Sequence, residues 1–515
     1  MPKAALHNLG CKVNAYETEA MQQQLEARGY EIVPFDQKAD VYIINTCSVT
    51  NIADRKSRQM LHRAKKMNPD SVVVAAGCYV QVAADALKED AAVDIIVGNN
   101  QKARLADILD EFFSGGREDV SYVVDISHTN EYEALHVDRI ADRTRAFIKV
   151  QDGCNQFCSY CIIPYARGRV RSRRPEEVLE EVRTLAAQGY KEMVLTGIHL
   201  SSYGLDFENP ESALTAGDYK AEENALYRPW LLRLIREVSG VEGIERIRLG
   251  SLEPRIITGE FAAELARLPK LCPHFHLSLQ SGCDATLKRM NRHYNTEEYR
   301  ERCGILREAF DNPAITTDVI VGFPGETEEE FAATRQYLEQ VHFYEMHVFK
   351  YSRREGTRAA VMPDQVPEPV KAERSDQLLE LEKRMSREYR QGFVGTVQEI
   401  LLEEPAEIGG LPCVVGHTRQ YVRAAVLSAD AGNTANCGAP ALEAGTAVKS
   451  AAPAFDARNT ANCTAPAAAA GTAANPAAPH EQHPAAPARG RIVKARITGF
   501  LDDETLLAEL TGEPG

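Results

Sequence analysis

Hydrophobic and polar positions alternate along the first part of the chain in a way that predicts strands separated by helices. Short apolar runs, which are typical of buried strands, are followed by segments whose apolar residues recur at helical spacing. In the first such helix Met21 and Leu25 lie one turn apart, and Gly29 marks its end. The pattern predicts a parallel, doubly wound sheet over residues 1–115. The expected strands are Lys3–Leu9, Val41–Asn45, Val72–Ala76 and Asp94–Val97, and the expected helices are Glu17–Arg28 and Asp54–Met67.

The same alternation returns over residues 142–371, after a polar, acidic stretch at 116–141 that we interpret as a linker. Six strand–helix repeats are too few for a closed eight-stranded barrel, so we expect a partial barrel with its functional groups at the carboxyl-terminal rim. A polar, acidic insertion at 205–224 interrupts one rim loop, and its role cannot be read from the sequence. The expected strands are Phe147–Val150, Glu192–Leu195, Arg246–Leu249, Phe275–Leu279, Thr317–Val321 and Glu345–Lys350.

The C-terminal part begins with a charged connector helix at 372–393 and continues as short strands over 394–515, a pattern that suits a small antiparallel β-barrel. Residues 428–488 interrupt this barrel with alanine, proline, glycine, asparagine and threonine, and contain an imperfect repeat. Such a composition buries too little apolar surface to offset chain entropy, so we expect the insertion to be disordered. The expected strands are Val394–Leu402, Gln420–Leu427, Arg491–Thr498 and Thr505–Leu510.

Composition narrows the class of protein. A chain of 515 residues with 44% hydrophobic residues suits several globular domains. It contains no apolar run long enough to span a membrane, and its start lacks the apolar core of a signal peptide, so we expect a cytoplasmic protein. Its 12 cysteines then favour metal ligation over disulfides.

Charge is unevenly distributed. The net charge of −15 alone disfavours a nucleic-acid partner. Basic residues nevertheless gather in three segments, at 55–66, 167–174 and 489–496, and each segment alone is as compatible with a solvated face as with a binding site. Together they favour an anionic substrate.

Three closely spaced cysteines, Cys154, Cys158 and Cys161, follow the predicted strand Phe147–Val150 on one loop. A 4Fe-4S cluster takes four ligands, so a loop that supplies three thiolates would leave one iron open to a small molecule. The alternatives are buried cysteines packed as small hydrophobic residues, or part of a structural zinc site. Zinc ligands usually come as two distant Cys-x-x-Cys pairs, which this loop does not match.

Three further cysteines, Cys11, Cys47 and Cys78, each follow a predicted strand of the N-terminal sheet within a few residues. The carboxyl ends of parallel strands lie at one edge of the sheet, so these thiols should converge and could hold a second 4Fe-4S cluster. Any one of them could instead be a packed residue. Gly10 and Gly77 would let the backbone approach such a cluster.

The segments around these six cysteines carry a family resemblance. The run 154–168, Cys-Asn-Gln-Phe-Cys-Ser-Tyr-Cys-Ile-Ile-Pro-Tyr-Ala-Arg-Gly, resembles the radical S-adenosylmethionine (SAM) methylthiotransferases, as do Leu-Gly-Cys-Lys-Val-Asn at 9–14, Asn-Thr-Cys-Ser-Val-Thr at 45–50 and Ala-Gly-Cys-Tyr at 76–79. The resemblance implies two 4Fe-4S clusters, SAM used both as a methyl donor and as a radical source, and a C-terminal RNA-binding barrel called TRAM. The insertion at 428–488 departs from the family and leaves RNA binding by this barrel in question.

The resemblance also suggests a substrate and partners. The branch that acts on N6-threonylcarbamoyladenosine beside the tRNA anticodon fits best, and it adds a methylthio group to carbon 2 of the adenine. The runner-up is the isopentenyladenosine branch, followed by methylthiolation of a ribosomal-protein aspartate and by a non-catalytic Fe–S RNA-binding protein. We expect a monomer served by a flavodoxin- or ferredoxin-type electron donor. SAM would meet Gly197, Ser251, Glu253, Gln280 and Asp318 at the barrel rim, and the anticodon stem-loop would meet Arg167, Arg169, Arg171, Arg173 and Arg174.

Overall fold

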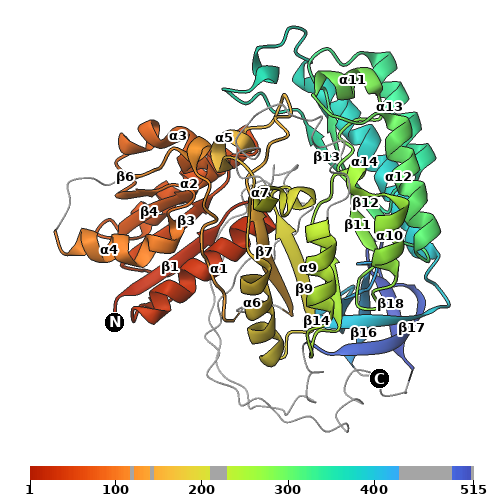
Figure 1. Cartoon of the computed structure of the whole chain (residues 1–515), viewed down its shortest axis with the longest axis horizontal. Coiled ribbons are helices and arrows are strands. Elements are labelled where there is room, and N and C mark those ends of the chain that lie inside the picture. The colour runs from red at the N-terminus through yellow and green to blue at the C-terminus, as the bar shows by residue number, and fades with distance from the viewer. Residues whose placement is uncertain (116–120, 140–143, 209–228, 429–489, 512–515) are drawn as a thin grey trace.

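The computed structural model describes residues 1–115, 121–139, 144–208, 229–428 and 490–511. The low-complexity insertion lies outside these residues, as does most of the rim insertion. The N-terminal domain is a six-stranded parallel sheet in the order β2-β1-β3-β4-β5-β6, with helices on both faces (Figure 1). Its strands are β1 (Lys3–Asn8), β2 (Glu31–Ile32), β3 (Val41–Thr46), β4 (Val72–Gly77), β5 (Ile95–Val97) and β6 (Ser121–Tyr122), and its helices are α1 (Lys12–Ala27), α2 (Asn51–Met67), α3 (Cys78–Lys88) and α4 (Leu105–Phe113).

The central strands of this sheet form because their sequences are apolar throughout. Every residue of β3 and β4 is buried, as expected for parallel strands that are covered by helices on both faces. Helix α1 begins at Lys12, five positions before the predicted start, because Val13 and Tyr16 are also buried. Strand β6 lies in the polar stretch that we interpreted as a linker and extends the sheet at its edge.

The central domain is an incomplete barrel of six parallel strands. Two hydrogen-bonded sheets, β7-β9-β10 and β11-β12-β13, are joined by isolated bridges from Ile247 to Leu271 and from Leu252 to Leu277, and the short β8 (Arg171–Ser172) pairs antiparallel with β7. The six strands are β7 (Arg145–Asp152), β9 (Glu192–Gly197), β10 (Arg246–Leu249), β11 (His274–His276), β12 (Ala314–Val321) and β13 (Glu345–Lys350). The helices of this domain include α5 (Ile163–Arg167), α6 (Pro175–Ala187), α7 (Leu205–Glu208), α9 (Pro229–Ser239), α10 (Gly259–Ala266), α11 (Asp284–Arg289), α12 (Thr296–Ala309) and α13 (Glu328–Val341).

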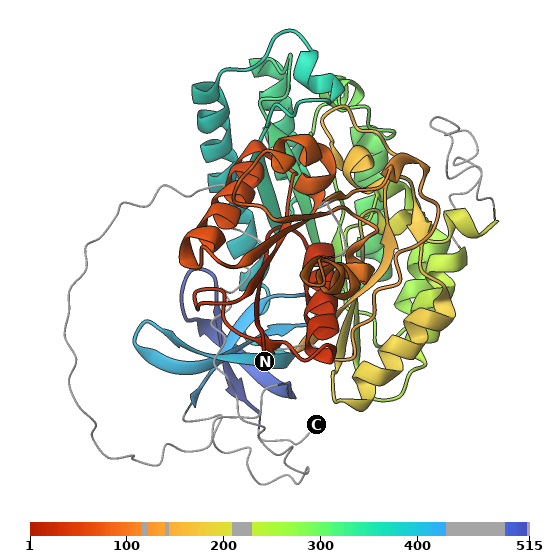
Figure 2. The same cartoon turned by 90° about the vertical axis from the view of Figure 1, so that its left-hand side faces the viewer.

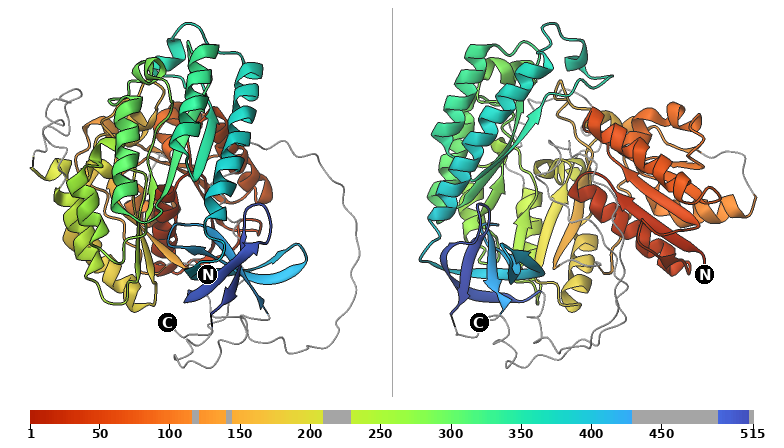
Figure 3. Two further views of the ribbon diagram at one scale, coloured as in Figure 1. Left: turned by 90° about the vertical axis from the view of Figure 1, so that its right-hand side faces the viewer. Right: turned by 180° about the vertical axis from the view of Figure 1, so that it is seen from behind.

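Helix α14 (Glu368–Gln391) leads into a closed five-stranded barrel, which confirms the predicted architecture. The strand order is β14-β15-β16-β18-β17, and β15 was not predicted because Pro412 and the preceding Gly409 and Gly410 resemble a turn. Figures 2 and 3 show this barrel beneath the central domain. Its strands are β14 (Val397–Ile408), β15 (Leu411–Thr418), β16 (Arg423–Leu427), β17 (Ile492–Phe500) and β18 (Leu506–Leu510).

The C-terminal barrel closes the amino-terminal end of the central barrel. Arg246 donates to the backbone carbonyls of Glu399 and His417 at 2.9 and 3.1 Å. The guanidinium groups of Arg145 and Arg248 both lie 4.7 Å from the ring of Tyr421, within the range of cation–π contacts. The N-terminal domain contacts the central barrel through α1, which packs against β7 and β9, and through Asp54, which pairs with Arg354 after β13. Among the helices of the described residues, none is long and apolar enough to cross a bilayer.

Candidate metal centres and active site

The structure brings Cys11, Cys47 and Cys78 together at one edge of the N-terminal sheet. Cys11 precedes α1, Cys47 follows β3 and Cys78 begins α3. A Cβ atom added to Gly10 would lie 3.0 Å from the Cβ and 3.1 Å from the Sγ of Cys47, and Gly10 has a φ of +113°. Glycine therefore allows the backbone beside Cys11 to approach Cys47.

The chemistry of this triad fits a metal cluster. Burial, followed by the neighbouring thiols of Cys78 and Cys11, raises the pKa of Cys47 to about 12. Three thiolates so close together need positive charge, and Arg167 supplies it, because its Nε lies 3.2 Å from the Sγ of Cys78. A bound metal would remove the thiol protons outright. The three cysteines thus suit a 4Fe-4S cluster with one open iron.

The second triad, Cys154, Cys158 and Cys161, lies on the loop that follows β7. Gly153 has a φ of +71°, and a Cβ there would overlap the carbonyl oxygen of Arg169 at 1.8 Å, so only glycine fits this turn. Burial and the neighbouring thiol of Cys158 raise the pKa of Cys161 to about 12. Arg292 donates to the Sγ of Cys158 at 3.2 Å. It therefore supplies positive charge to the second triad, as Arg167 does to the first.

Glu17 of α1 ties the two domains together beneath the first triad. Its carboxylate lies 2.7 Å from the Nζ of Lys102, 2.8 Å from the Nζ of Lys149 and 2.8 Å from Arg167. All four side chains are fully buried, and these cations hold the pKa of Glu17 well below its usual range in spite of burial. Helix α1 is therefore attached to β7 and α5 of the central domain by charge.

This burial corrects the predicted RNA contacts. Arg167, Arg171 and Arg173 are almost completely buried, with Arg173 2.6 Å from Glu181, so in this conformation they offer no surface to a phosphate. The other two residues of the predicted set remain accessible. Arg169 is half-buried over the ring of Phe157, and Arg174 is exposed over the ring of Phe207.

A second contact between the domains involves the loop that carries Cys47. Arg354, which follows β13, lies 2.5 Å from Asp54 and donates to Ser48 at 2.8 Å. The backbone N–H of Asn51 donates to the hydroxyl of Ser352 at 3.1 Å. These contacts attach the Cys47 loop to the segment that follows β13 of the central barrel.

Four of the five residues predicted to meet SAM lie at or after the carboxyl-terminal ends of barrel strands, and the fifth, Asp318, lies within β12. Gly197 ends β9, where a Cβ would lie 2.8 Å from the Gln151 side chain, and Ser251 is exposed after β10. Gln280 has a φ of +75° and bridges to β12. Glu253 is buried and accepts from the backbone N–H and the side chain of Arg255, so in this structure it also caps a short turn.

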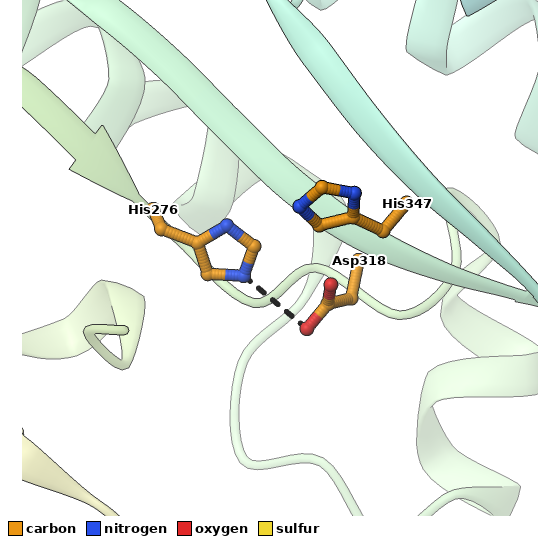
Figure 4. A group of neighbouring side chains, drawn as sticks. All are labelled: His276, Asp318 and His347. Atoms are coloured by element: carbon orange, nitrogen blue, oxygen red, sulfur yellow. Dashed lines mark ion pairs between the residues drawn. The ribbon is translucent and has the colours of Figure 1, made fainter. Parts of the chain in front are cut away.

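The fifth, Asp318, belongs to a group that the sequence did not single out. His276 on β11, Asp318 on β12 and His347 on β13 point toward one another, and their ligand atoms all lie within 4.8 Å (Figure 4). The Nε2 of His276 lies 3.2 Å from Asp318, and its Nδ1 lies 3.0 Å from the hydroxyl of Thr316. Two imidazoles and one carboxylate are a set that could hold a divalent metal.

Lys12 was also missed, because nothing in its local sequence marks it apart from its neighbour Cys11. Lys12 is the first residue of α1, which packs against β7 and β9, and its side chain is partly buried. Burial and the charges of Arg145 and Arg248 lower its pKa to about 8. The charge of Lys12 also acts on His347. Only the folded structure could have revealed this residue, since its neighbours come from distant strands.

Two family models match the chain. Residues 3–98 match the uncharacterized protein family UPF0004, and residues 148–338 match the radical SAM superfamily. The threonylcarbamoyladenosine tRNA methylthiotransferase MtaB of Bacillus subtilis is 43% identical over 82% of this chain and 90% of its own length, and the Aquifex aeolicus protein of that name is 40% identical over 78% and 93%. The tRNA-2-methylthio-N(6)-dimethylallyladenosine synthase of Acetivibrio thermocellus is 37% identical over 77% of this chain and 80% of its own length.

Two cysteine triads, on an N-terminal sheet and on the first loop of a partial barrel, define a radical SAM enzyme of the methylthiotransferase class. This membership confirms the predicted use of SAM and 4Fe-4S clusters. Within that class, the chain belongs to the MtaB-like branch of the radical SAM methylthiotransferase family.

Proposed function

We propose that this enzyme adds a methylthio group to carbon 2 of N6-threonylcarbamoyladenosine beside the anticodon of tRNA. The observation that carries the proposal is the presence of two cysteine triads, one on the N-terminal sheet and one on the loop after β7, together with the high identity to proteins named for this reaction. Methylthiolation of isopentenyladenosine is the second candidate, because relatives named for that substrate are also similar.

Each triad has its own task in this proposal. Cys154, Cys158 and Cys161 would hold the cluster that binds and cleaves SAM, and Cys11, Cys47 and Cys78 would hold the cluster that carries the sulfur. Bound there, these cofactors supply a 5′-deoxyadenosyl radical and a methylated sulfur, which side chains cannot provide. Arg292 and Arg167 each donate to one thiolate, balance its charge and so favour a more reduced cluster.

SAM would lie along the rim formed by Gly197, Ser251, Glu253, Gln280 and Asp318. Glu253 and Asp318 offer carboxylate oxygens as hydrogen-bond acceptors, and the exposed Ser251 after β10 offers a hydroxyl. Gly197 lets the end of β9 lie close to the Gln151 side chain. The adenine of the substrate would enter between the triads, where the contacts of Arg354 and Glu17 fix the distance between the two domains.

The RNA would approach over the exposed side of both cysteine loops. Tyr165 and Val49 are 49% and 54% exposed beside the two loops, and Tyr165 packs edge-on against Phe157. Exposed aromatic rings stack on unpaired bases of an anticodon loop, and Arg169 and Arg174 would meet the backbone. Helix α2 presents Arg55, Arg58 and Lys66 to solvent and adds a second basic surface.

The remaining partners are part of the same proposal. The enzyme would work as a cytoplasmic monomer that receives electrons from a flavodoxin- or ferredoxin-type protein. The closed C-terminal barrel exposes Lys494 and Arg496 on β17, and these would contact the tRNA outside the anticodon loop.

The test is a reconstituted reaction under anaerobic conditions with SAM, a sulfur source and a chemical reductant. Two synthetic anticodon stem-loops would be compared, one with N6-threonylcarbamoyladenosine and one with isopentenyladenosine. The proposal predicts a methylthio product on the first and little on the second. Product only on the isopentenyl stem-loop would show that isopentenyladenosine is the substrate. Protein that contains its clusters but cleaves no SAM would contradict the assignment as a radical SAM enzyme.

A further inference from the structure

The interior of the central barrel contains an unusual set of polar groups between the cysteine triads and the C-terminal barrel. His274 and His276 lie on one face of β11, and His347 lies on β13, where its neighbour in register is Asp318. Lys12 enters from α1, which packs against β7 and β9. Most parallel barrels fill this space with apolar side chains, so a polar interior indicates a ligand.

Several of these groups have no partner. Among the described residues, neither the ammonium of Lys12 nor the imidazole of His347 forms a hydrogen bond or an ion pair, and both side chains are only partly exposed. The Nδ1 atom of His274, a residue that is 8% exposed, is also buried without a hydrogen-bond partner in this part of the chain. Buried polar groups normally find partners, so the Nδ1 of His274 is expected to meet one on a bound molecule. Lys12 and His347 are only partly buried, so both are free to contact the same molecule.

The charge of the surroundings selects the kind of ligand. Arg145 and Arg248 are already paired, with Glu403 at 2.7 Å and with Glu192 at 3.0 Å. Asp318 is likewise occupied by His276 at 3.2 Å. Among the described residues no carboxylate forms an ion pair with Lys12, and this free cation disfavours a metal ion at His276, Asp318 and His347 and favours an anion.

We propose that Lys12 and His347 form a carboxylate-binding subsite that recognises the amino-acid group on N6 of the target adenosine. The proposal rests on the proposed function and extends it, because it names the residues that choose between substrates. A carboxylate would pair with Lys12 and accept a hydrogen bond from His347, whose neighbour in register, Asp318, is held by His276 at 3.2 Å.

The same subsite explains rejection of the apolar alternative. An isopentenyl group placed there would bury the ammonium of Lys12 without a partner. The free energy lost by desolvating this charge far exceeds the free energy gained by burying the isopentenyl group. Sites built to satisfy a polar group on the substrate discriminate strongly against analogues that lack it. Specificity would thus be set inside the barrel, although the cysteine triads perform the chemistry.

The experiment measures RNA binding to the holoenzyme without reductant, so that no turnover occurs. Fluorescence anisotropy would compare stem-loops that carry the threonylcarbamoyl acid, its carboxamide or unmodified adenosine. Wild-type enzyme should bind the acid at least about tenfold more tightly than the carboxamide, the scale expected for a charge-assisted hydrogen bond. Lys12→Gln and His347→Gln should each reduce this preference while leaving affinity for the unmodified stem-loop nearly constant, and Lys12→Arg should retain much of it.

The controls separate this inference from its alternatives. Lys383→Gln, at an exposed position of α14, should leave the preference unchanged, and iron content and visible absorbance should match wild type in all variants. Wild-type enzyme that methylthiolates the threonylcarbamoyl stem-loop yet binds acid and carboxamide equally would overturn the inference and leave the proposed function intact. Acid preference that survives both Gln variants, or that appears only after Zn²⁺ or Co²⁺ is added, would overturn it too. Failure to methylthiolate any threonylcarbamoyl RNA would instead overturn the proposed function.

Discussion

Replacement of Glu17 by glutamine tests whether the two domains are held together by charge. The substitution keeps the size of the side chain but removes the carboxylate that, alone among the described residues, pairs with all three of Lys102, Lys149 and Arg167, at 2.7 to 2.8 Å. Asp152 then remains as the nearest anion, 2.6 Å from Lys149 and 3.1 Å from Arg167. Three buried cations with one counter-ion are expected to destabilise the folded chain.

The expected loss in free energy of unfolding follows from the burial of the Glu17 ion pairs. Removing one partner of a fully buried ion pair costs about 3–5 kcal/mol, whereas an exposed pair contributes about 0–1 kcal/mol. Glu26→Gln is the matched control, because Glu26 lies on the same helix and pairs with Arg139, whose side chain is 62% exposed. Glu17→Gln should therefore lower the free energy of unfolding several times more than Glu26→Gln.

The assay is urea unfolding of cluster-free protein, followed by circular dichroism, with hydrogen exchange of the peptide that covers α1. A loss of about 3–5 kcal/mol in the free energy of unfolding corresponds to about 10²- to 10⁴-fold less protection from hydrogen exchange. This applies to those amides of α1 that exchange through global unfolding. The pKa of Glu17 lies well below its ordinary value of 4.5, so its contribution is complete above pH 4.5 and is lost as the pH falls through the lowered pKa. The difference between wild type and Glu17→Gln should thus shrink only in acid. A loss below about 1 kcal/mol at neutral pH would refute the reasoning.

Three further predictions concern the candidate sites. Cys158→Ala should abolish SAM cleavage and keep the N-terminal cluster, and Cys47→Ala should do the reverse; iron analysis and 5′-deoxyadenosine formation check both, and methylthiolated product from Cys47→Ala would disprove the assignment. Gly10→Ala should lower iron occupancy, because its Cβ would meet Cys47 at 3.0 Å, whereas Gly29→Ala, also at positive φ but with no atom within 4 Å, should not; equal iron content would exclude the steric argument. Tyr165→Ala should weaken stem-loop binding by about 1–3 kcal/mol if the ring stacks on a base, while Phe113→Ala, 55% exposed on α4, should have no effect in the same anisotropy titration.

Much of the fold is predictable because buried parallel strands consist of short runs of consecutive apolar residues, which are visible in the sequence. Strands β10 and β13 begin and end at the predicted residues. Strand β11 was placed too late, since the chain after His276 turns away through Gln280, whose φ is +75°. Strands of two residues such as β2, β6 and β8 carry no pattern long enough to detect.

The candidate site was predictable only where function imposes spacing along the chain. The six cysteines occupy fixed positions after strands, and the structure brings each set of three together. A run of arginines looks the same whether it faces solvent or a buried carboxylate, so Arg167 was misassigned because its partner Glu17 is 150 residues away. Lys12 and His347 are also far apart in sequence, and only the fold relates them.

The measurement that tests the central claim most directly is mass spectrometry of nucleosides from total tRNA of the host, with and without this gene. The account predicts that 2-methylthio-N6-threonylcarbamoyladenosine disappears and its unthiolated precursor accumulates when the gene is removed. Loss of the isopentenyl counterpart alone would contradict the assigned substrate, and unchanged levels of both nucleosides would contradict the account as a whole.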